Sequence, residues 1–435
     1  MLENGTNFGF SVVEDKPQRQ TATVIISKEY VQALYEEALH TRKKQEKTYG
    51  FSKGNTPLHY IEQNFRSTIV EHLKELLFTH CVLHHLYDSL SAKKIVICGD
   101  PDLISIKLQP EAPAEFVFSL ANVSFDQEKR WKRLSLKPLS RKNYKDLDRQ
   151  VENFIEEELS CKEKCSSDAI QIGDWVNFEV TLKDGENKDL TPGYASDLWI
   201  SLQDNEDDKD LQDLFKGKMV GDVFTSDSVF LQDYVSQASD LTYAFQVTIK
   251  ERLPGAYFSL DLFRHQFGIK EEEDITGKLV EVFSTRNDIT LRRETIEAVF
   301  RLLHKQYFFM VPSRLLDQQI KMVLKGLHDN PDYLVYKAQD DFKANVKALA
   351  EKQLKEAIII DAIAYQEGIT VDSKDICAYL NLLKRPRMKD FMYFGLPETT
   401  VQGHETPQST ALLKRYCLRE KTLNYLIKEI TQPKL

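Results

Sequence analysis

The chain has 435 residues, of which 42% are hydrophobic and 29% charged, a composition typical of globular proteins with room for two to four domains. Its net charge of −9 argues against general coating of nucleic acid, but it does not exclude a local basic patch. No apolar run approaches the roughly 20 residues that span a bilayer, and residues 1–5 lack the basic and apolar segments of a signal peptide, so we expect a cytosolic protein with no membrane partner and six reduced cysteines.

The N-terminal part has the pattern of an α+β unit. β-branched residues at 22–26 predict a strand, and Ser27 after them is a favourable N-cap for a helix. That helix is expected to run to about Lys47 and to end at Gly50, and Thr56-Pro57 begins the next one as N-cap and first helical residue. In order, the expected elements are a strand within 9–26, helices at 28–47 and 57–90, and strands at 95–98, 104–108 and 115–120. Together they predict a small sheet with a protruding pair of helices.

Residues 49–57, between the two predicted helices, read Tyr-Gly-Phe-Ser-Lys-Gly-Asn-Thr-Pro. Two glycines flank an aromatic ring and a lysine, in a loop that we expect to face solvent. A large aromatic residue in water is unusual for a simple connector and is more natural for a docking site. The basic residues near this loop, opposite in sign to the whole chain, are Arg42, Lys43, Lys44, Lys47 and Lys53, against Glu46 alone.

A charged segment at 125–167 follows, and we expect it to be a linker arm and not a core. Residues 128–145 are mainly basic, and residues 147–164 are mostly acidic and helical. Cys161 and Cys165 lack the Cys-x-x-Cys spacing of reactive thiol pairs, so we expect ordinary helix cysteines.

From Ile172 to about Leu253 the pattern is typical of strands. Residues 176–182 alternate between apolar and polar and end in a turn signal at 183–185, and residues 243–249 form the closing strand. This segment predicts a β-rich unit.

After Pro254 the periodicity predicts long helices at 291–303, 312–327, 340–366 and 410–430. We therefore expect an α+β multidomain protein with an α+β unit at 1–124, a linker at 125–167, a β-rich unit at 168–253 and an all-α unit with long arms at 254–435. Large apolar residues of the last unit are candidates for a binding surface or for its core: Phe308, Phe309, Met310, Tyr333, Tyr336, Phe391, Tyr393 and Phe394.

This chain resembles bacterial trigger factor, a family of ribosome-associated chaperones, over nearly its full length. The family carries Gly-Phe-Arg-x-Gly-x-x-Pro at its ribosome contact, and residues 50–57 here read Gly-Phe-Ser-Lys-Gly-Asn-Thr-Pro. The order of elements is similar too, with an FKBP-like unit in the middle, and residues 267–269 and 311–316 look like the family's helix starts. The resemblance implies that ribosome docking is carried by Gly50, Phe51, Ser52, Lys53, Gly54 and Pro57.

Ser52 departs from the family pattern, which has arginine at this position. Arginine is a strong phosphate donor, whereas serine keeps one hydrogen bond and loses the charge. The resemblance implies that Lys53 meets rRNA phosphate and that Phe51 meets an apolar or base surface, with the other basic residues as electrostatic support. The alternative is a plain turn of a helical hairpin with solvated charges.

The FKBP resemblance implies a prolyl isomerase pocket whose candidate residues are Phe178, Asp189, Tyr234 and Phe245. Such a pocket lowers the barrier to X-Pro rotation by favouring the twisted amide in a dry apolar site. Other pocket positions match poorly, because Lys188 and Leu211 stand where aromatic residues are expected, and residues 207–208 are aspartates where apolar residues are expected. We therefore expect weak or absent isomerase activity, with the aromatic candidates serving as core residues.

His80 and His84 are spaced to share one helix face, which suits a zinc pair, but no further ligands follow at convincing spacing, so we expect no metal site. Motifs for nucleotide binding and hydrolysis are missing, and no cofactor is expected. The resemblance implies an ATP-independent chaperone whose partners are the ribosome at its tunnel exit and nascent or unfolded polypeptides, with a homodimer off the ribosome. It would assist folding and export. The alternatives are a stand-alone FKBP-type isomerase and a ribosome-free chaperone or assembly factor.

Overall fold

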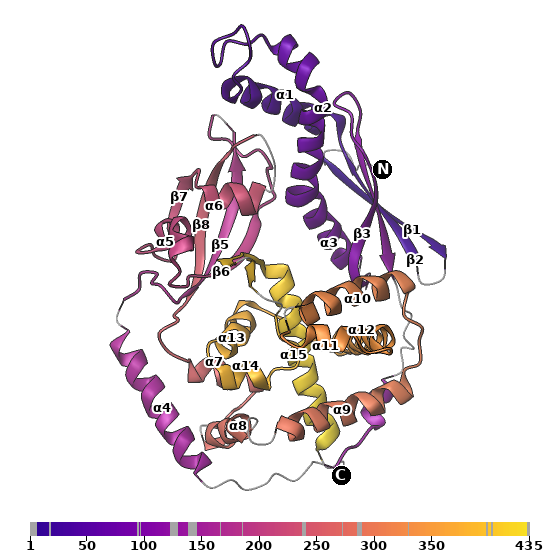
Figure 1. The fold of residues 1–435 in the computed structure, drawn as a ribbon, viewed down its shortest axis with the longest axis vertical. Helices are drawn as coiled ribbons and strands as arrows, with labels where there is room; N and C mark the ends of the chain where they lie inside the picture. The colour runs from indigo at the N-terminus through magenta and orange to yellow at the C-terminus, as the bar shows by residue number, and fades with distance from the viewer. Residues whose placement is uncertain are drawn as a thin grey trace.

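The computed structural model describes residues 7–16, 19–93, 95, 97–121, 129–137, 146–165, 167–184, 186–236, 241–271, 273–284, 289–328, 330–396, 399–401 and 403–432. An N-terminal unit with a long helical hairpin lies at the top of Figure 1, a second sheet lies beside it, and a body of helices lies below both. The expected α+β fold with a helical C-terminal part is therefore confirmed. Across the described residues, no helix is both long enough and apolar enough to cross a membrane.

The first sheet has four antiparallel strands in the order β1-β2-β4-β3. These strands are β1 (Phe8–Lys16), β2 (Arg19–Ile26), β3 (Cys98–Lys107) and β4 (Ala114–Ala121). Burial alternates along β4, where Phe116, Phe118 and Leu120 face the core. The predicted pair of strands near 95–98 and 104–108 is instead the single strand β3, which follows β4 through two shifts of register.

A long helical hairpin protrudes from this sheet. Its elements are α1 (Lys28–Gln45), α2 (Leu58–Leu77), a π-helical turn (Phe78–Val82) and α3 (Leu83–Ala92). Ser27 caps α1 as predicted, because its hydroxyl accepts a hydrogen bond of 3.3 Å from a backbone N–H of the first turn. Helix α1 ends at Gln45, before the predicted Lys47, and Pro57 is the N-cap of α2 in place of Thr56, whose side chain is fully buried.

Helix α4 (Leu147–Lys164) has the predicted bounds, but it packs on the helical body and does not hang free as a linker arm. Leu147 and Val151 are buried against Phe258 and Phe263. Most acidic residues of α4 face solvent, with Glu158 the buried exception, whereas most of its apolar residues recur at helical spacing and form one stripe toward the body.

The second sheet has five strands in the order β11-β6-β5-β8-β7. They are β5 (Trp175–Lys183), β6 (Ser196–Ser201), β7 (Val223–Ser226), β8 (Ala244–Leu253) and β11 (Gln408–Ser409), accompanied by α5 (Lys209–Phe215) and α6 (Val229–Leu231). Gln408 of β11 pairs with Trp199 of β6. A strand from the C-terminal part of the chain therefore completes the sheet of the predicted β-rich unit.

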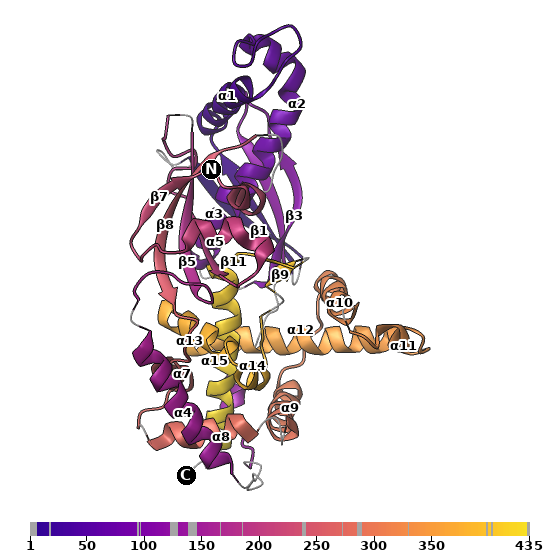
Figure 2. The same ribbon diagram turned by 60° about the vertical axis from the view of Figure 1, so that its left-hand side comes forward.

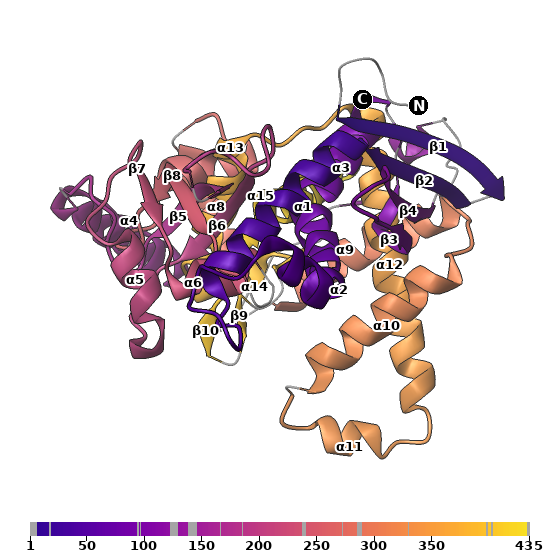
Figure 3. The ribbon, with the colours of Figure 1, turned by 90° about the horizontal axis from the view of Figure 1, so that it is seen from above.

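The helical body carries one projecting hairpin. Its elements are α7 (Leu260–Phe267), α8 (Glu273–Ser284), α9 (Ile289–Gln306), α10 (Ser313–His328), α11 (Tyr333–Lys337), α12 (Phe342–Glu367), α13 (Ser373–Leu383), α14 (Pro386–Phe391), the hairpin β9 (Thr400–Val401) and β10 (His404–Glu405), and α15 (Thr410–Thr431). Residues 313–350, called the arm below, stand away from the body (Figures 2 and 3). The motif 267–269 ends a helix and does not start one, because Gly268 is the left-handed C-cap of α7.

Direct contacts join the helical hairpin to the second sheet. The side-chain amide of Gln45 donates to the carbonyl of Thr242 at 2.7 Å and accepts from its N–H at 3.0 Å. The ring of His72 stacks on Tyr243 with ring centres 5.5 Å apart. The hairpin is therefore braced along its side, while its far end stays clear of the sheet (Figure 1).

The edge of the first sheet rests on the helical body. Cys98 is buried in one cluster with Leu315, Leu354 and Ile358. Next to it Gly99 has φ +72, and a Cβ on it would lie 2.7 Å from the Leu315 side chain. This close approach places the base of the arm against β3.

Candidate functional site

Residues 48–57, called the tip below, close the far end of the helical hairpin with two tight turns. The backbone N–H of Phe51 donates to the carbonyl of Thr48 at 3.1 Å, and that of Asn55 donates to the carbonyl of Ser52 at 3.0 Å. A glycine with positive φ is the third residue of each four-residue turn, at +85 for Gly50 and +86 for Gly54. Both conformations strain residues with a Cβ, which explains why glycine flanks the exposed ring and lysine.

The base of the tip is closed and its end is open. Thr56 is fully buried and its hydroxyl lies 3.1 Å from that of Thr48, so a hydrogen bond ties the two ends of the loop. Tyr49 is 98% exposed and Phe51 37% exposed. The Phe51 ring rests 5.5 Å from the ring of Tyr60, which holds it at the surface. The tip thus presents aromatic side chains on a supported turn.

The basic residues near the tip divide into two groups. Lys44, Lys47 and Lys53 are exposed and extend the positive surface toward the tip. Arg42, which the sequence suggested as electrostatic support, is instead buried, in an ion pair of 2.9 Å with Glu46 and above a ring of α2. Its guanidinium therefore stabilises the hairpin from within.

The resemblance to the ribosome-docking motif predicts that arginine in place of Ser52 raises ribosome affinity about threefold to tenfold, because a guanidinium adds a charge-assisted bond to phosphate. The position accepts the change, since the exposed Ser52 hydroxyl only receives a 2.8 Å hydrogen bond from the side chain of Asn55. Co-sedimentation of the variant with ribosomes measures the effect. Asn55→Arg is the control for a general gain of charge, and equal tightening by both variants would contradict a specific role for position 52.

The four candidate isomerase residues do not form an open pocket. Phe178 and Phe245 are fully buried on one face of the β5–β8 pair. The ring of Phe215 from α5 lies 4.8 Å from that of Phe178 and occupies the space above it. Asp189 is exposed and pairs with Lys183 at 2.6 Å. Two of the candidates are thus core residues, as the poor match of the surrounding positions suggested.

The fourth candidate, Tyr234, is half-buried, with its ring 5.1 Å from that of Phe230, and burial raises the pKa of its hydroxyl. Asp208, which replaces an apolar pocket residue, is buried and accepts hydrogen bonds from His404 at 3.0 Å and from the backbone N–H of Glu405 at 3.1 Å. This carboxylate therefore anchors the β9–β10 hairpin beside the sheet. Binding of a proline ring would not require such an anchor.

The apolar candidates of the helical body separate clearly by exposure. Phe308 and Met310 are 94% and 72% exposed, and Tyr336 on α11 is 40% exposed. Phe391 is buried, and Phe309, Tyr333, Tyr393 and Phe394 are half-buried. The sequence pattern did not single out further exposed residues of the arm, which are Met322, Leu334, Val335 and Leu349. Leu334 and Val335 lie on the five-residue helix α11, which is too short to give a periodic signal, whereas Met322 and Leu349 lie on the long helices α10 and α12.

The histidines weighed as a zinc pair lie at the contact between the hairpin and the second sheet. His80 is on the π-helical turn, where its Nδ1 lies 3.4 Å from the hydroxyl of Ser196. The Nδ1 of His85 lies 3.2 Å from the hydroxyl of Tyr194. Burial lowers the pKa of His84 and of His85, which favours their neutral forms. These contacts assign His80, of the predicted pair, and its neighbour His85 to packing between the two units.

Another cluster joins residues that are distant in the chain, so no local sequence pattern indicates it. His265, Asp372 and Asp375 bring their ligand atoms within 4.8 Å of one another. Asp375 and Asp372 form the capping box of α13, and the Asp375 carboxylate also receives His265 at 2.9 Å and Lys421 at 2.8 Å. A helix cap and two cationic partners therefore account for this arrangement.

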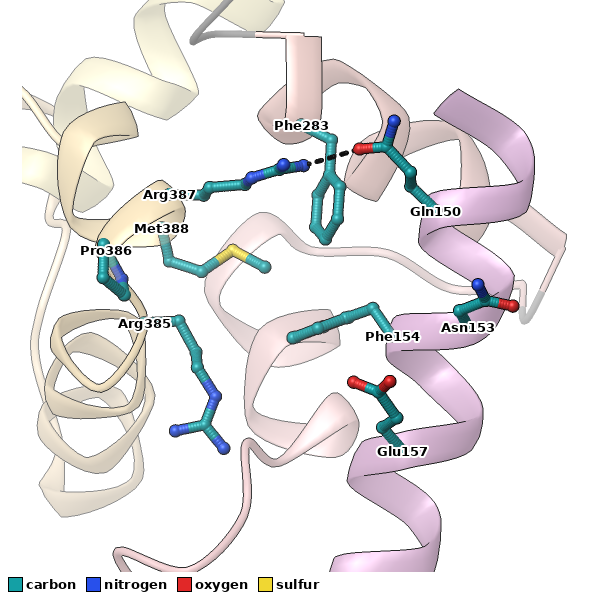
Figure 4. A pocket seen from close by; sticks show the side chains of 9 residues that line it. All are labelled: Gln150, Asn153, Phe154, Glu157, Phe283, Arg385, Pro386, Arg387 and Met388. Atoms are coloured by element: carbon teal, nitrogen blue, oxygen red, sulfur yellow. Dashed lines mark hydrogen bonds between the residues drawn. The ribbon is translucent and has the colours of Figure 1, made fainter. Parts of the chain in front are cut away.

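A cavity of about 390 Å³ marks the seam where α4 meets α8 and α14 (Figure 4). Phe154 and Phe283 form its apolar wall, with ring centres 5.3 Å apart. The guanidinium of Arg387 lies 4.5 Å from the centre of the Phe283 ring and donates to Gln150 at 3.1 Å. These contacts cross the seam, so we assign them to the attachment of α4.

Two family models match the chain. The model for bacterial trigger factor protein matches residues 10–157, and the model for the C-terminus of the same protein matches residues 273–427. The trigger factor of Geobacter metallireducens is 24% identical over 430 residues, covering 92% of this chain and 93% of that protein. The trigger factor of Psychrobacter cryohalolentis is 22% identical over 428 residues, covering 94% and 90%.

A solved structure of the trigger factor chaperone aligns with 97% of this chain and 100% of its own, at 16% identity and a TM-score of 0.38. The family assignment rests on the sequence matches, which together span more than half of the chain and lie on both sides of the second sheet. This chain belongs to the trigger factor family of ribosome-associated chaperones.

Proposed function

We propose that this chain is an ATP-independent chaperone that docks at the ribosomal tunnel exit through the tip and shields emerging polypeptides with the arm. The observation that carries the proposal is the tip itself, where Phe51 and Lys53 are exposed on a turn that two glycines and a buried threonine pair hold in shape. A preorganised loop loses less conformational entropy on binding than a mobile one.

The chemistry of the tip suits an RNA-rich surface. Lys53 offers an ammonium group to phosphate, and the rings of Tyr49 and Phe51 offer stacking or apolar contact. Ser52 supplies a hydroxyl that stays exposed. Co-sedimentation of the purified chain with ribosomes tests this docking, and a wild-type chain that stays in the supernatant would contradict it.

The arm suits weak contact with many polypeptides. Leu334 and Val335 on α11 are 75% and 64% exposed, at the end of the arm that projects farthest from the body (Figure 3). Phe308 and Met310 extend the apolar surface between α9 and α10. Separate small patches bind unfolded chains without collapsing on one another, and weak binding lets a client leave to fold.

Replacing Leu334 and Val335 together by serine is expected to weaken the suppression of client aggregation about threefold or more, because each side chain loses part of a burial gain of about 1.5–3 kcal/mol. Light scattering of a denatured client diluted into increasing chaperone concentrations measures the effect. The control replaces Val220 and Val223 by serine, which are 52% and 57% exposed on the second sheet. Equal loss in both double variants would remove the arm from its proposed role.

The first alternative function, a stand-alone prolyl isomerase, is tested by the rate of proline isomerisation. Since Phe178 and Phe245 are fully buried, we expect little acceleration of proline isomerisation by the wild-type chain. Phe178→Leu is expected to lower the melting temperature without changing the rate of proline isomerisation. A protease-coupled assay with a proline peptide measures this isomerisation rate. Strong wild-type activity that falls when Phe178 or Phe245 is changed would favour a stand-alone isomerase.

The remaining alternative is a ribosome-free chaperone or assembly factor, which would share the arm but not use the tip. Ribosome binding that depends on the tip would favour the ribosome-docking chaperone over the ribosome-free one. A cytoplasmic location follows from the ribosomal partner that we propose. Homodimerisation off the ribosome stays a prediction from the family resemblance, and light scattering of the free chain checks it.

A further inference from the structure

A cavity of about 620 Å³ lies in the helical body, away from both the tip and the arm. Helices α7, α8 and α14, the start of α9 and the C-terminal half of α15 enclose it, in the lower part of the molecule (Figure 1). This volume is within the range of sites that hold small organic molecules.

Three buried N–H donors on the cavity wall lack an acceptor. They belong to the side-chain amide of Gln266, the Nε of Arg292 and the side-chain amide of Asn424. Gln266 is only 8% exposed. The acceptor of Asn424 is already used, because its Oδ1 receives the Arg292 guanidinium at 2.8 Å. Buried donors without acceptors are unfavourable, so the wall favours a molecule that brings acceptor oxygens.

The cavity wall is also cationic. Lys278, Arg292 and Lys421 line it, and each has a carboxylate partner, at 2.7, 3.3 and 2.8 Å. Lys428 lines it too, and within the described part of the chain it has no carboxylate partner. Burial lowers the pKa of Lys278, so its ammonium is less well stabilised than in water and would gain from a nearby anion. The wall therefore leaves about one positive charge to be matched.

Apolar side chains line the wall as well. They are Phe267, Ile269, Leu291, Phe391 and Ile427. The cations pack on two of these rings, because the Arg292 guanidinium lies 4.2 Å from the centre of the Phe391 ring and the Lys278 ammonium lies 5.2 Å from that centre and 4.9 Å from the centre of the Phe267 ring. A ligand that matches both kinds of group has one anionic part and one apolar part.

We propose that this cavity binds a carboxylate carried on an apolar group, with the oxygens at Gln266, Asn424 and Lys428 and the apolar group against the half-buried Phe267 and Ile427. A carboxylate matches the single uncompensated charge and accepts several N–H donors at once. A phosphate monoester would bring nearly two charges, for which the lining has no second free cation among the described residues. Two sources share this chemistry, namely the C-terminal residue of a polypeptide and a free apolar acid.

Isothermal titration of the full-length chain tests the proposal without ribosomes, so its outcome is independent of the docking proposal. The probes are N-acetyl-leucine and N-acetyl-leucinamide, which differ only in the carboxylate. We expect saturable binding of the acid and binding of the amide weaker by about tenfold or more, the usual loss on removing a charge-assisted contact. Tighter binding of N-acetyl-glycyl-leucine than of hexanoate would identify a polypeptide C-terminus as the source, and the reverse order would identify a free acid.

Two variants locate the site. Gln266→Leu removes the buried donor at similar volume, and Lys428→Met removes the charge at an exposed position. Each is expected to weaken N-acetyl-leucine about fivefold or more. The controls Gln63→Leu and Lys305→Met make the same changes at exposed positions outside the cavity and are expected to bind as the wild type does.

Three results would overturn the proposal. One is a wild-type chain that does not bind N-acetyl-leucine, and another is equal binding of the acid and the amide. The third is unchanged binding by the Lys428→Met variant, whose exposed position makes misfolding an inadequate explanation.

Discussion

Replacing Phe51 and Lys53 together by alanine is expected to weaken ribosome binding about tenfold or more, because exposed aromatic anchors and phosphate contacts dominate such interfaces. Removing these two side chains leaves the turn itself intact, because its hydrogen bonds run between backbone groups and between Thr48 and Thr56. Co-sedimentation with ribosomes at two salt concentrations measures both parts of the effect. Losing Lys53 should also make the binding less sensitive to salt, because one phosphate contact is removed.

The matched control replaces Phe308 and Lys305 by alanine. Phe308 is 94% exposed and Lys305 is exposed near the end of α9, so the control removes an aromatic ring and a charge far from the tip. It is expected to sediment with ribosomes as the wild type does. If the tip variant also sediments like the wild type, the tip is only the turn of a hairpin and the docking proposal fails.

Replacing Glu158 by alanine is expected to destabilise the attachment of α4 by about 3–5 kcal/mol, the usual cost of leaving one partner of a buried ion pair alone. Glu158 is 6% exposed and receives two hydrogen bonds from the Arg385 guanidinium, at 2.6 and 2.7 Å. It also accepts a bond of 2.6 Å from the backbone N–H of Phe258. One carboxylate thus joins α4, the start of the helical body and the turn before α14.

Thermal unfolding followed by circular dichroism measures this effect, together with limited proteolysis of the segment around α4. Glu157→Ala is the matched control, because Glu157 is the exposed neighbour on the same turn and lines the seam shown in Figure 4. The control should unfold within a degree or two of the wild type, as surface substitutions usually do. A Glu158→Ala chain as stable and as protease-resistant as this control would show that α4 does not depend on the ion pair.

Local signals were sufficient for the long helices of this chain. Ser27 caps α1 because a serine before an amphipathic segment satisfies a free N–H wherever it occurs. The bounds of α4 and the regions of α9, α10, α12 and α15 follow from periodicity, which depends only on neighbours along the chain. The tip could be predicted for the same reason, since glycines with positive φ and a proline before a helix act within a few residues.

Contacts between distant residues decided the rest. Residues 408–409 complete a sheet whose other strands end before residue 254. A two-residue strand is too short to carry a local pattern that predicts its pairing with β6. Burial of Arg42, of Phe178 and of the donors around the cavity depends on which elements pack against them. The sequence by itself therefore determined the family, the long helices and the exposed tip. Only the tertiary structure decided which of the candidate side chains face solvent and which are core, because exposure is a property of packing and not of residue type.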